Sequence, residues 1–173
     1  YGLQLPTLNV GGGMGINYQD PERSFDWSAF CQALTALIDK EAMGGVRVRF
    51  EIGRFIAASC GYYVMQVLDI KRNHGQYFAV GRGGTHHFRT PAAQGHDHPF
   101  EIIRADGPAV LKNTKVTLVG QLCTPKDVLS RERAVAALGV GDLLVFPLAG
   151  AYAWNISHRD FLMHPPPEIV FLS

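Results

Sequence analysis

The spacing of apolar residues predicts alternating strand and helix in the first third of the chain. Pro6–Val10 is a short apolar and β-branched run that ends at a cluster of glycines, which is typical of a buried strand feeding a loop. Over Asp26–Met43 apolar residues recur at helical spacing, and Gly44-Gly45 ends the pattern. Val46–Glu51 then alternates apolar and charged residues with the period of a strand. These patterns predict one β/α unit and the strand that begins the next.

Beyond Arg54 the pattern changes to short strands separated by glycine, proline and asparagine, which is typical of an antiparallel sandwich or barrel. The predicted strands are Tyr62–Ile70, Tyr77–Val80, Phe100–Ile103, Val116–Leu122, Leu143–Pro147 and Ile169–Leu172. Gly150–Ser157 is predicted to form a short helix or a turn. We therefore expect an α+β chain, with a β/α segment over residues 1–57 and an antiparallel Greek-key β-barrel or sandwich over residues 58–173.

Composition narrows the classes of protein that fit. The 173 residues are 47% hydrophobic, which supports a folded core, and the net charge of +1 gives no basic run for nucleic acid or an anionic membrane. No apolar stretch approaches the ~20 residues of a membrane-spanning helix. Three widely spaced cysteines do not suit a disulfide framework. We expect a cytoplasmic protein that binds neither nucleic acid nor membrane.

Two motifs near the N-terminus are suited to binding an anion. Gly11-Gly12-Gly13-Met14-Gly15 follows a predicted strand, where glycines let backbone N–H groups approach phosphate oxygens; a flexible turn is an equally good explanation. Glu51-Ile52-Gly53-Arg54 follows the next strand. There Glu51 could hold a pyridinium nitrogen in its protonated form and Arg54 could bind a phosphate. A surface ion pair also fits this second motif.

Two further motifs lie in the β-rich part. Cys123 follows an apolar strand in a polar turn, a place for a proton donor or nucleophile, although a buried inert cysteine fits as well. Gly150-Ala151-Tyr152 could present a phenol to a phosphate, or Tyr152 could belong to the core.

The order and spacing of the four motifs resemble one family, the diaminopimelate and ornithine decarboxylases of the alanine-racemase-like class, which use pyridoxal 5′-phosphate (PLP). Leu8–Tyr18 resembles the family's phosphate loop, Glu51–Arg54 its Glu-Pro-Gly-Arg motif, Cys123–Asp127 its Gly-Pro-x-Cys turn, and Gly150–Tyr152 its Gly-Ala-Tyr motif. The resemblance covers essentially the whole chain. It implies the last β/α segments of a PLP-binding TIM-type barrel over residues 1–57, followed by the family's C-terminal β-domain.

The resemblance also implies roles for individual residues. Gly11–Gly13 would hold the PLP phosphate, assisted by Arg54 and Tyr152, while Glu51 would pair with the ring nitrogen. Cys123 would reach across the interface of a homodimer and protonate the substrate carbon after carbon dioxide leaves. In the family, active sites lie between the two subunits.

The sequence departs from the family pattern in the substrate-binding positions. Arg89 falls where the family has an arginine before proline that binds a substrate carboxylate, but here Thr90 intervenes before Pro91. Thr124 stands where diaminopimelate decarboxylases have an acidic residue that holds the distal substrate amine. Ile52 replaces the proline of the Glu-Pro-Gly-Arg motif. The Ile52 change loosens the turn without removing chemistry, but Thr124, together with Ala92 and Ala93 where the family's substrate pocket has a tyrosine, predicts that diaminopimelate is not the substrate.

The arginine- and histidine-rich stretch from Gly84 to Phe100 resembles the branch of the family that works in siderophore assembly. It suits an amino-acid substrate that bears extra carboxylates. The family's Schiff-base lysine lies on the first barrel strand, before the point that matches Tyr1. The chain's lysines lie in no matching context: Lys40, Lys71, Lys112, Lys115 and Lys126. We expect a C-terminal fragment that is inactive alone.

Two alternatives belong to other functional classes. His96-Asp97-His98-Pro99-Phe100-Glu101 is similar to the metal motif of cupin barrels, because histidines two apart share one face of a strand. Glu101 would face the other way, however, and His158 and His164 are poor candidates for a further ligand. Our expectation is therefore that there is no metal site. The second alternative is a non-catalytic, regulatory relative of the decarboxylases.

Overall fold

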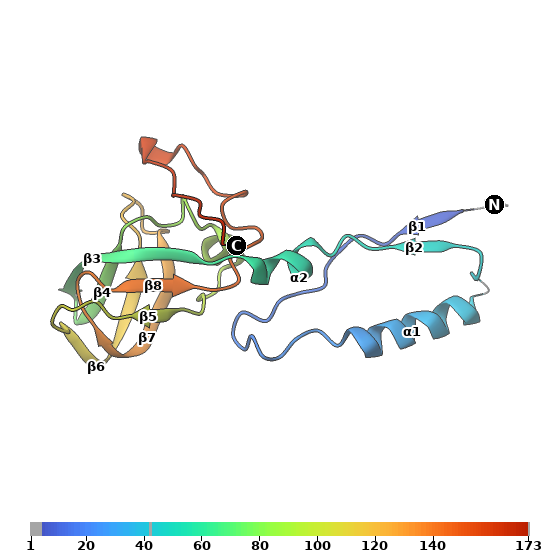
Figure 1. Ribbon diagram of the computed structural model, residues 1–173, viewed down its shortest axis with the longest axis horizontal. Coiled ribbons are helices and arrows are strands. Elements are labelled where there is room, and N and C mark those ends of the chain that lie inside the picture. The colour runs from blue at the N-terminus through green and yellow to red at the C-terminus, as the bar shows by residue number, and fades with distance from the viewer. Residues whose placement is uncertain (1–4, 42, 173) are drawn as a thin grey trace. The chain divides into compact units, whose positions relative to one another are not determined.

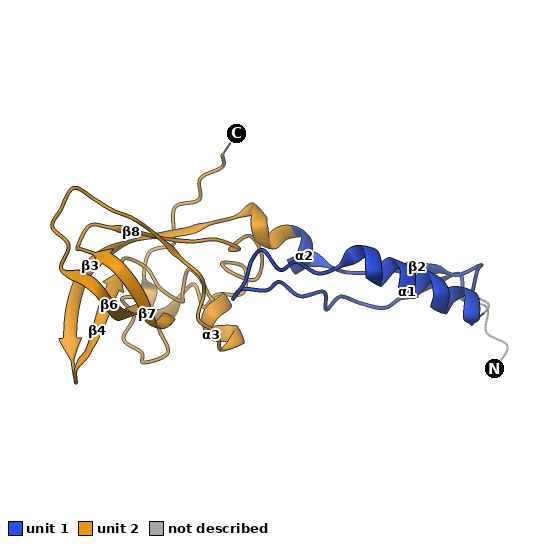
Figure 2. Cartoon of the chain, turned by 90° about the horizontal axis from the view of Figure 1, so that it is seen from below, with its two compact units in different colours: residues 1–56 blue, residues 57–173 orange. Residues whose placement is uncertain are grey.

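The computed structural model describes residues 5–41 and 43–172. The chain divides into two compact units, residues 1–56 (unit 1) and residues 57–173 (unit 2), which are coloured separately in Figure 2. No helix in the described ranges has both the length and the apolar content to cross a bilayer.

Unit 1 contains a parallel strand pair joined through a helix. Strand β1 (Thr7–Asn9) pairs in parallel with β2 (Arg47–Arg49), and α1 (Trp27–Lys40) lies between them in sequence (Figure 1). The side chain of Asp26 caps the helix by accepting a hydrogen bond from the Ala29 backbone N–H at 2.9 Å. These three elements confirm the strand, helix and strand expected from the sequence pattern, each a little shorter than predicted. Helix α2 (Gly53–Ala57) follows β2.

Aromatic side chains hold unit 1 together. The rings of Trp27, Phe30 and Phe50 lie 5.5–6.5 Å apart between centroids, and Phe25 and Phe55 join the same cluster. All five side chains remain partly exposed to solvent, and Tyr18 is the sole buried residue among those described in this unit. Unit 1 therefore has an aromatic cluster but no closed core.

Unit 2 is built on a six-stranded sheet with the order β5-β8-β3-β4-β6-β7. Its elements are the short 3-10 helix η1 (Ala58–Cys60), β3 (Tyr63–Asn73), β4 (Gln76–Gly81), α3 (Thr90–Gln94), β5 (Glu101–Ile103), β6 (Leu111–Val119), β7 (Val128–Leu138), β8 (Leu143–Phe146) and η2 (Phe161–Met163). Four neighbouring pairs are antiparallel, but β4 and β6 are parallel. The purely antiparallel sheet that we predicted is thus wrong at one pair, because the connection from β4 to β6 crosses over through α3 and β5.

The two edges of this sheet approach each other, so that it forms a nearly closed barrel (Figure 1). The His98 backbone N–H, just before β5, donates to the Leu129 carbonyl of β7 at 3.0 Å. The Asp97 side chain accepts from the Arg131 backbone N–H at 2.9 Å. These bonds give edge strand β7 partners in the segment just before β5, which the edge of an open sheet would lack.

The interior of the barrel is apolar and fully buried. Leu118, Leu129, Leu144 and Phe146 have no solvent exposure, and Phe88 from the β4–α3 connection packs with them. At about 1.5–3 kcal/mol for each fully buried side chain of this size, these contacts are a main source of the stability of unit 2.

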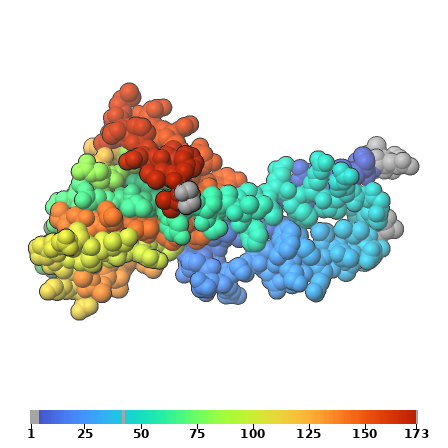
Figure 3. Space-filling view, in the orientation of Figure 1, coloured from blue at the N-terminus to red at the C-terminus, as the bar shows by residue number. Residues whose placement is uncertain are grey.

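In unit 2, one predicted strand is absent and one observed strand was not predicted. Ile169–Leu172 is not a strand; its side chains are exposed, and the C-terminal segment, red in Figure 3, lies on the surface. Strand β7 was missed because the polar run Ser130–Arg133 interrupts its alternation. Gly150–Ser157 forms turns and bends, as expected.

Candidate cofactor and substrate site

The glycine loop and Glu51 are linked directly at the ends of the two parallel strands of unit 1. The Asn9 side-chain amide donates to a Glu51 carboxylate oxygen at 2.8 Å, and its oxygen accepts from the Gly11 backbone N–H at 2.8 Å. The Glu51 backbone N–H donates to the Gly11 carbonyl at 2.8 Å. Asn9 therefore orients the Glu51 carboxylate beside the glycine loop, a role that no pattern in the sequence indicated.

Gly12 requires glycine because of the backbone that faces it. A Cβ atom at Gly12 would lie 2.3 Å from the Glu51 carbonyl oxygen, far inside van der Waals contact. Gly11 and Gly13 have φ values of +75° and +102°, which side chains disfavour. The loop is thus shaped for close backbone approach, and its exposed Glu51 neighbour remains accessible.

Arg54 is held by an aromatic residue from the same unit. One terminal guanidinium nitrogen donates to the Tyr18 hydroxyl at 2.6 Å, and the guanidinium carbon lies 5.8 Å from the centroid of the Tyr18 ring. Tyr18 ends the segment that resembles the family's phosphate loop. The structure thus connects both N-terminal motifs through side chains as well as through the β1–β2 pair.

Cys123 lies exposed in a turn between β6 and β7, residues 120–127, here called the Cys123 turn. The turn is closed by backbone bonds from Thr124 to Leu122 at 2.8 Å and from Asp127 to Thr124 at 3.2 Å. Thr124 is half-buried beside the cysteine, and its hydroxyl accepts a long bond of 3.4 Å from the Lys126 backbone N–H. An exposed thiol in a defined turn is available for proton transfer.

Arg89 and Tyr152 belong to two segments that are bonded to each other. The Thr90 hydroxyl donates to the Tyr152 carbonyl at 2.6 Å, and the Arg89 backbone N–H donates to the Ala153 carbonyl at 3.3 Å. The Arg89 guanidinium lies 3.0 Å from His158 Nδ1. Tyr152 is 41% exposed, which rules out the alternative interpretation that this side chain belongs to the core.

Residues 83–87, here called the His86 loop, precede Arg89 and carry two histidines. His86 is fully buried, and neither ring nitrogen has a hydrogen-bonding partner among the described residues. Burial, together with the neighbouring His87 and His164, lowers the pKa of His86 to about 4. His87 donates through Nε2 to the Pro165 carbonyl at 2.8 Å, and burial lowers its pKa as well. The simplest explanation of these histidines is that they are polar residues of a surface loop. That explanation does not account for the burial of His86.

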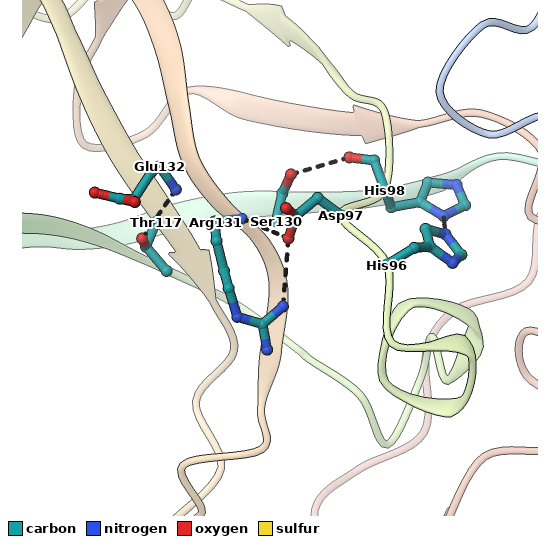
Figure 4. Close-up of polar contacts among 7 residues, drawn as sticks. All are labelled: His96, Asp97, His98, Thr117, Ser130, Arg131 and Glu132. Atoms are coloured by element: carbon teal, nitrogen blue, oxygen red, sulfur yellow. Dashed lines mark hydrogen bonds and ion pairs between the residues drawn. The ribbon is translucent and has the colours of Figure 1, made fainter.

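The geometry does not favour the metal-binding alternative. His96 Nε2 lies 3.1 Å from His98 Nδ1 (Figure 4). His98 Nε2 donates to the Pro147 carbonyl at 2.7 Å. Both nitrogens of the buried His98 ring are therefore engaged within the protein. Across the described parts of the chain, no three His, Cys, Asp or Glu side chains gather closely enough to hold an ion.

Comparison with known proteins identifies, over most of the chain, the family that the four sequence motifs resemble. Residues 25–150 match the family described as pyridoxal-dependent decarboxylase, C-terminal sheet domain. The chain is 49% identical over 175 residues to 2-[(L-alanin-3-ylcarbamoyl)methyl]-2-hydroxybutanedioate decarboxylase of Staphylococcus aureus, with 98% of this chain and 44% of the relative covered. It is 33% identical over 177 residues to L-glutamyl-[BtrI acyl-carrier protein] decarboxylase of Niallia circulans, with 96% of this chain and 41% of the relative covered.

Solved structures show the same fold. Diaminopimelate decarboxylase from M. jannaschii, in a complex with L-lysine, superposes with a TM-score of 0.78 at 25% identity, covering 92% of this chain and 36% of the other. The chain thus spans less than half the length of the relatives that it matches. The resemblance drawn from the four motifs is confirmed: the chain belongs to the pyridoxal-dependent decarboxylases and contains their C-terminal sheet domain.

Proposed function

We propose that this chain is the C-terminal part of a PLP-dependent decarboxylase that acts on the amino-acid centre of a carboxylate-rich substrate, such as a siderophore precursor. The observation that carries the proposal is the bonded network of Asn9, Gly11 and Glu51 at the ends of two parallel strands. It sets a glycine loop beside a carboxylate, and a pyridoxal phosphate needs a loop of this kind for its phosphate and a carboxylate for its ring nitrogen. Residues 1–57 are then the last β/α segments of a TIM-type barrel, and residues 58–173 the β-domain.

The residues present fit the cofactor. Gly11–Gly13 would hold its phosphate, with the backbone N–H groups of Gly12 and Gly13 as donors, since the Gly11 N–H is already donated to the Asn9 side chain. Arg54 and Tyr152 would add a charge-assisted and a neutral hydrogen bond. Glu51 would keep the ring nitrogen protonated. When bound, PLP supplies an electron sink for the charge left by departing carbon dioxide.

Cys123 is the proton donor in this proposal. Its exposed thiol gives up the S–H proton to the substrate carbon, a C–H bond forms, and solvent water returns a proton to the thiolate. The thiol acts across the interface of a homodimer in the cytoplasm. Arg89 binds a substrate carboxylate, and Thr124 faces the distal part of the substrate without a charge.

The nature of the relatives supports a substrate larger than a free amino acid. The name of the Staphylococcus aureus relative describes an alanine moiety linked through a carbamoyl group to a hydroxybutanedioate, and that of the Niallia circulans relative an L-glutamyl group on a carrier protein. Arg89 and the neighbouring histidines would suit carboxylates of the first kind. An uncharged Thr124 does not suit the distal amine of diaminopimelate.

The test is the visible absorption spectrum of the full-length parent before and after borohydride, followed by peptide mapping. A band that borohydride bleaches, with PLP fixed on a lysine upstream of Tyr1, is the expected result. A colourless protein that takes up no PLP would overturn the proposal.

Two variants of the parent then test the assigned roles. Cys123→Ala is expected to retain PLP and lose proton transfer, and unchanged turnover would remove Cys123 from the reaction. Glu51→Gln is expected to bind PLP nearly as well but to decarboxylate more slowly. A wild-type rate in that variant would exclude Glu51 from the chemistry.

A further inference from the structure

Asp127 is a buried carboxylate at the end of the Cys123 turn. It is 2% exposed, and its two oxygens accept hydrogen bonds from two different loops. Oδ1 accepts from the Thr85 backbone N–H at 2.7 Å, and Oδ2 accepts from the Leu122 backbone N–H at 2.8 Å. Thr85 belongs to the His86 loop, and Leu122 immediately precedes Cys123.

The surrounding backbone is shaped around this carboxylate. A Cβ atom on Gly84 would lie 2.5 Å from Asp127 Oδ1, and one on Gly120 would lie 2.2 Å from Oδ2. Further backbone bonds join the same segments, from Gly120 to the Asp127 carbonyl at 3.0 Å and from Gln121 to the Gly83 carbonyl at 2.9 Å. The Tyr63 hydroxyl accepts from the Gly84 N–H at 3.0 Å and supports the loop from strand β3.

Burial of a carboxylate is costly unless hydrogen bonds compensate for the lost water. Within the described residues, no lysine or arginine forms an ion pair with Asp127; the titratable side chains that sense its charge are Tyr63, His87 and His158. The two backbone N–H groups therefore compensate for the charge, and charge-assisted bonds of this kind are among the stronger ones.

The contacts continue from the His86 loop to the segment of Tyr152. Thr90 bonds to the Tyr152 carbonyl and Arg89 to the Ala153 carbonyl, as described above. The Asp127 carboxylate, together with the Gln121–Gly83 backbone bond, thus ties the Cys123 turn to the part of the unit that holds Arg89 and Tyr152.

We propose that Asp127 is a positioning residue for the decarboxylase reaction: its carboxylate fixes the Cys123 turn against the His86 loop and so sets where the thiol proton is delivered. This inference rests on the proposed function, in which Cys123 is the proton donor. Asp127 itself touches neither substrate nor cofactor. Loss of Oδ1 as an acceptor weakens the link from the Cys123 turn to the His86 loop, and loss of Oδ2 loosens the turn beside Cys123. A small displacement of the thiol is enough to slow proton transfer.

The chain offers a matched control in Asp142. This residue is 1% exposed, and its oxygens also accept from two backbone N–H groups, those of Gly139 at 2.7 Å and Ala105 at 2.9 Å. Unlike Asp127, Asp142 also forms an ion pair with an arginine, Arg104. In the described parts of the chain, Asp142 forms its hydrogen bonds with Arg104, Ala105 and Gly139 and none with the Cys123 turn, so its loss should destabilise the fold without moving the thiol.

The experiment compares Asp127→Asn and Asp142→Asn in the full-length dimeric parent. Three quantities are measured: kcat, its solvent deuterium isotope effect, and the rate of Cys123 alkylation by iodoacetamide, followed at the Cys123 peptide. For Asp127→Asn we expect kcat to fall roughly tenfold to a hundredfold, the isotope effect to rise as proton delivery limits turnover, and the alkylation rate to change. PLP absorbance and KM should stay close to wild type. Asp142→Asn should leave the isotope effect and the alkylation rate unchanged.

A wild-type isotope effect and alkylation rate in Asp127→Asn would overturn the inference, because a purely structural carboxylate would alter stability alone. If the asparagine variant does not accumulate, Asp127→Ser, which keeps a single acceptor, is measured in the same way and by the same criterion. Failure of the proposed function can be told apart from failure of this inference. If the proposed function is wrong, the parent binds no PLP or Cys123→Ala turns over at the wild-type rate, whatever the result for the Asp127 variants.

Discussion

Units 1 and 2 differ in how completely they bury their apolar side chains. Unit 2 closes a six-stranded sheet around side chains such as Leu144 and Phe146, which have no exposure. Among its described residues, unit 1 has two three-residue strands, helix α1 and most of the short helix α2, and its aromatic cluster remains partly exposed. Yet the Asn9–Gly11–Glu51 network lies in unit 1. The comparison teaches that the well-packed core of the chain and its hydrogen-bonded candidate cofactor groups lie in different units.

The largest expected effect is on the core of unit 2. Phe146→Ala should lower the free energy of unfolding by about 3–5 kcal/mol, because it leaves a cavity among close-packed side chains. Trp27→Ala in unit 1 removes a side chain that is 39% exposed and should cost less than half as much. Urea unfolding followed by far-UV circular dichroism measures both, and equal losses would contradict the contrast between the units.

The pH dependence should also come from unit 2. Burial, opposed in part by the bond to the Pro147 carbonyl, lowers the pKa of His98 to about 4, and His86 titrates in the same range. In the unfolded chain histidine titrates near ~6.5, so the unfolded state binds more protons between those values. Stability should therefore fall as the pH is lowered from about 6.5 to about 4, by up to roughly 1.4 kcal/mol per pH unit for each such histidine.

His98→Gln removes one of these histidines and should flatten the pH dependence of the urea midpoint between pH 5 and 7. His74→Asn, in the exposed β3–β4 turn, is the control and should leave the slope as it is in wild type. The same slope in wild type and His98→Gln would show that His98 does not carry the effect.

A smaller effect tests the glycine loop of unit 1. In the full-length parent, Gly12→Ala should weaken PLP binding about tenfold, because the new Cβ atom pushes against the Glu51 carbonyl. Gly15→Ala is the matched control from the same loop, since a Cβ atom there meets nothing within 4 Å and its φ is not positive. A spectrophotometric PLP titration distinguishes them, and equal affinities would count against the loop as a phosphate site.

The smallest effect is expected on the surface of unit 1. Lys40 and Glu41 lie 3.8 Å apart at the end of α1, with side chains 79% and 53% exposed. Lys40→Ala should change the free energy of unfolding by less than about 0.5 kcal/mol, since exposed ion pairs contribute little. A thermal melt with a clearly lower Tm would mean that the end of α1 contributes more to unit 1 than its exposure indicates.

Sequence patterns predicted unit 1 better than unit 2. The strand, helix and strand of unit 1 are encoded by local apolar spacing, and Asp26 as the cap is a local signal too. In unit 2, Ile169–Leu172 has the composition of a strand but no neighbour to pair with in the described structure. Strand β7 contains a polar run over Ser130–Arg133. It is tolerated because the last three side chains of the run are exposed and the buried Ser130 hydroxyl donates to the His98 carbonyl. Strand composition is therefore a weaker guide than the pairing that surrounds it.

The sequence by itself determined the family, through four short motifs whose order and spacing do not depend on how distant segments meet. It also determined which residues are candidates for binding and chemistry: the glycine loop, Glu51, Arg54 and Cys123. Only the tertiary structure decided that β4 and β6 run parallel, that the barrel nearly closes, and that Asp127 joins the Cys123 turn to the His86 loop across 42 residues of sequence. A buried carboxylate obtains its partners from segments brought together by folding, and no local pattern in the chain encodes which segments those are.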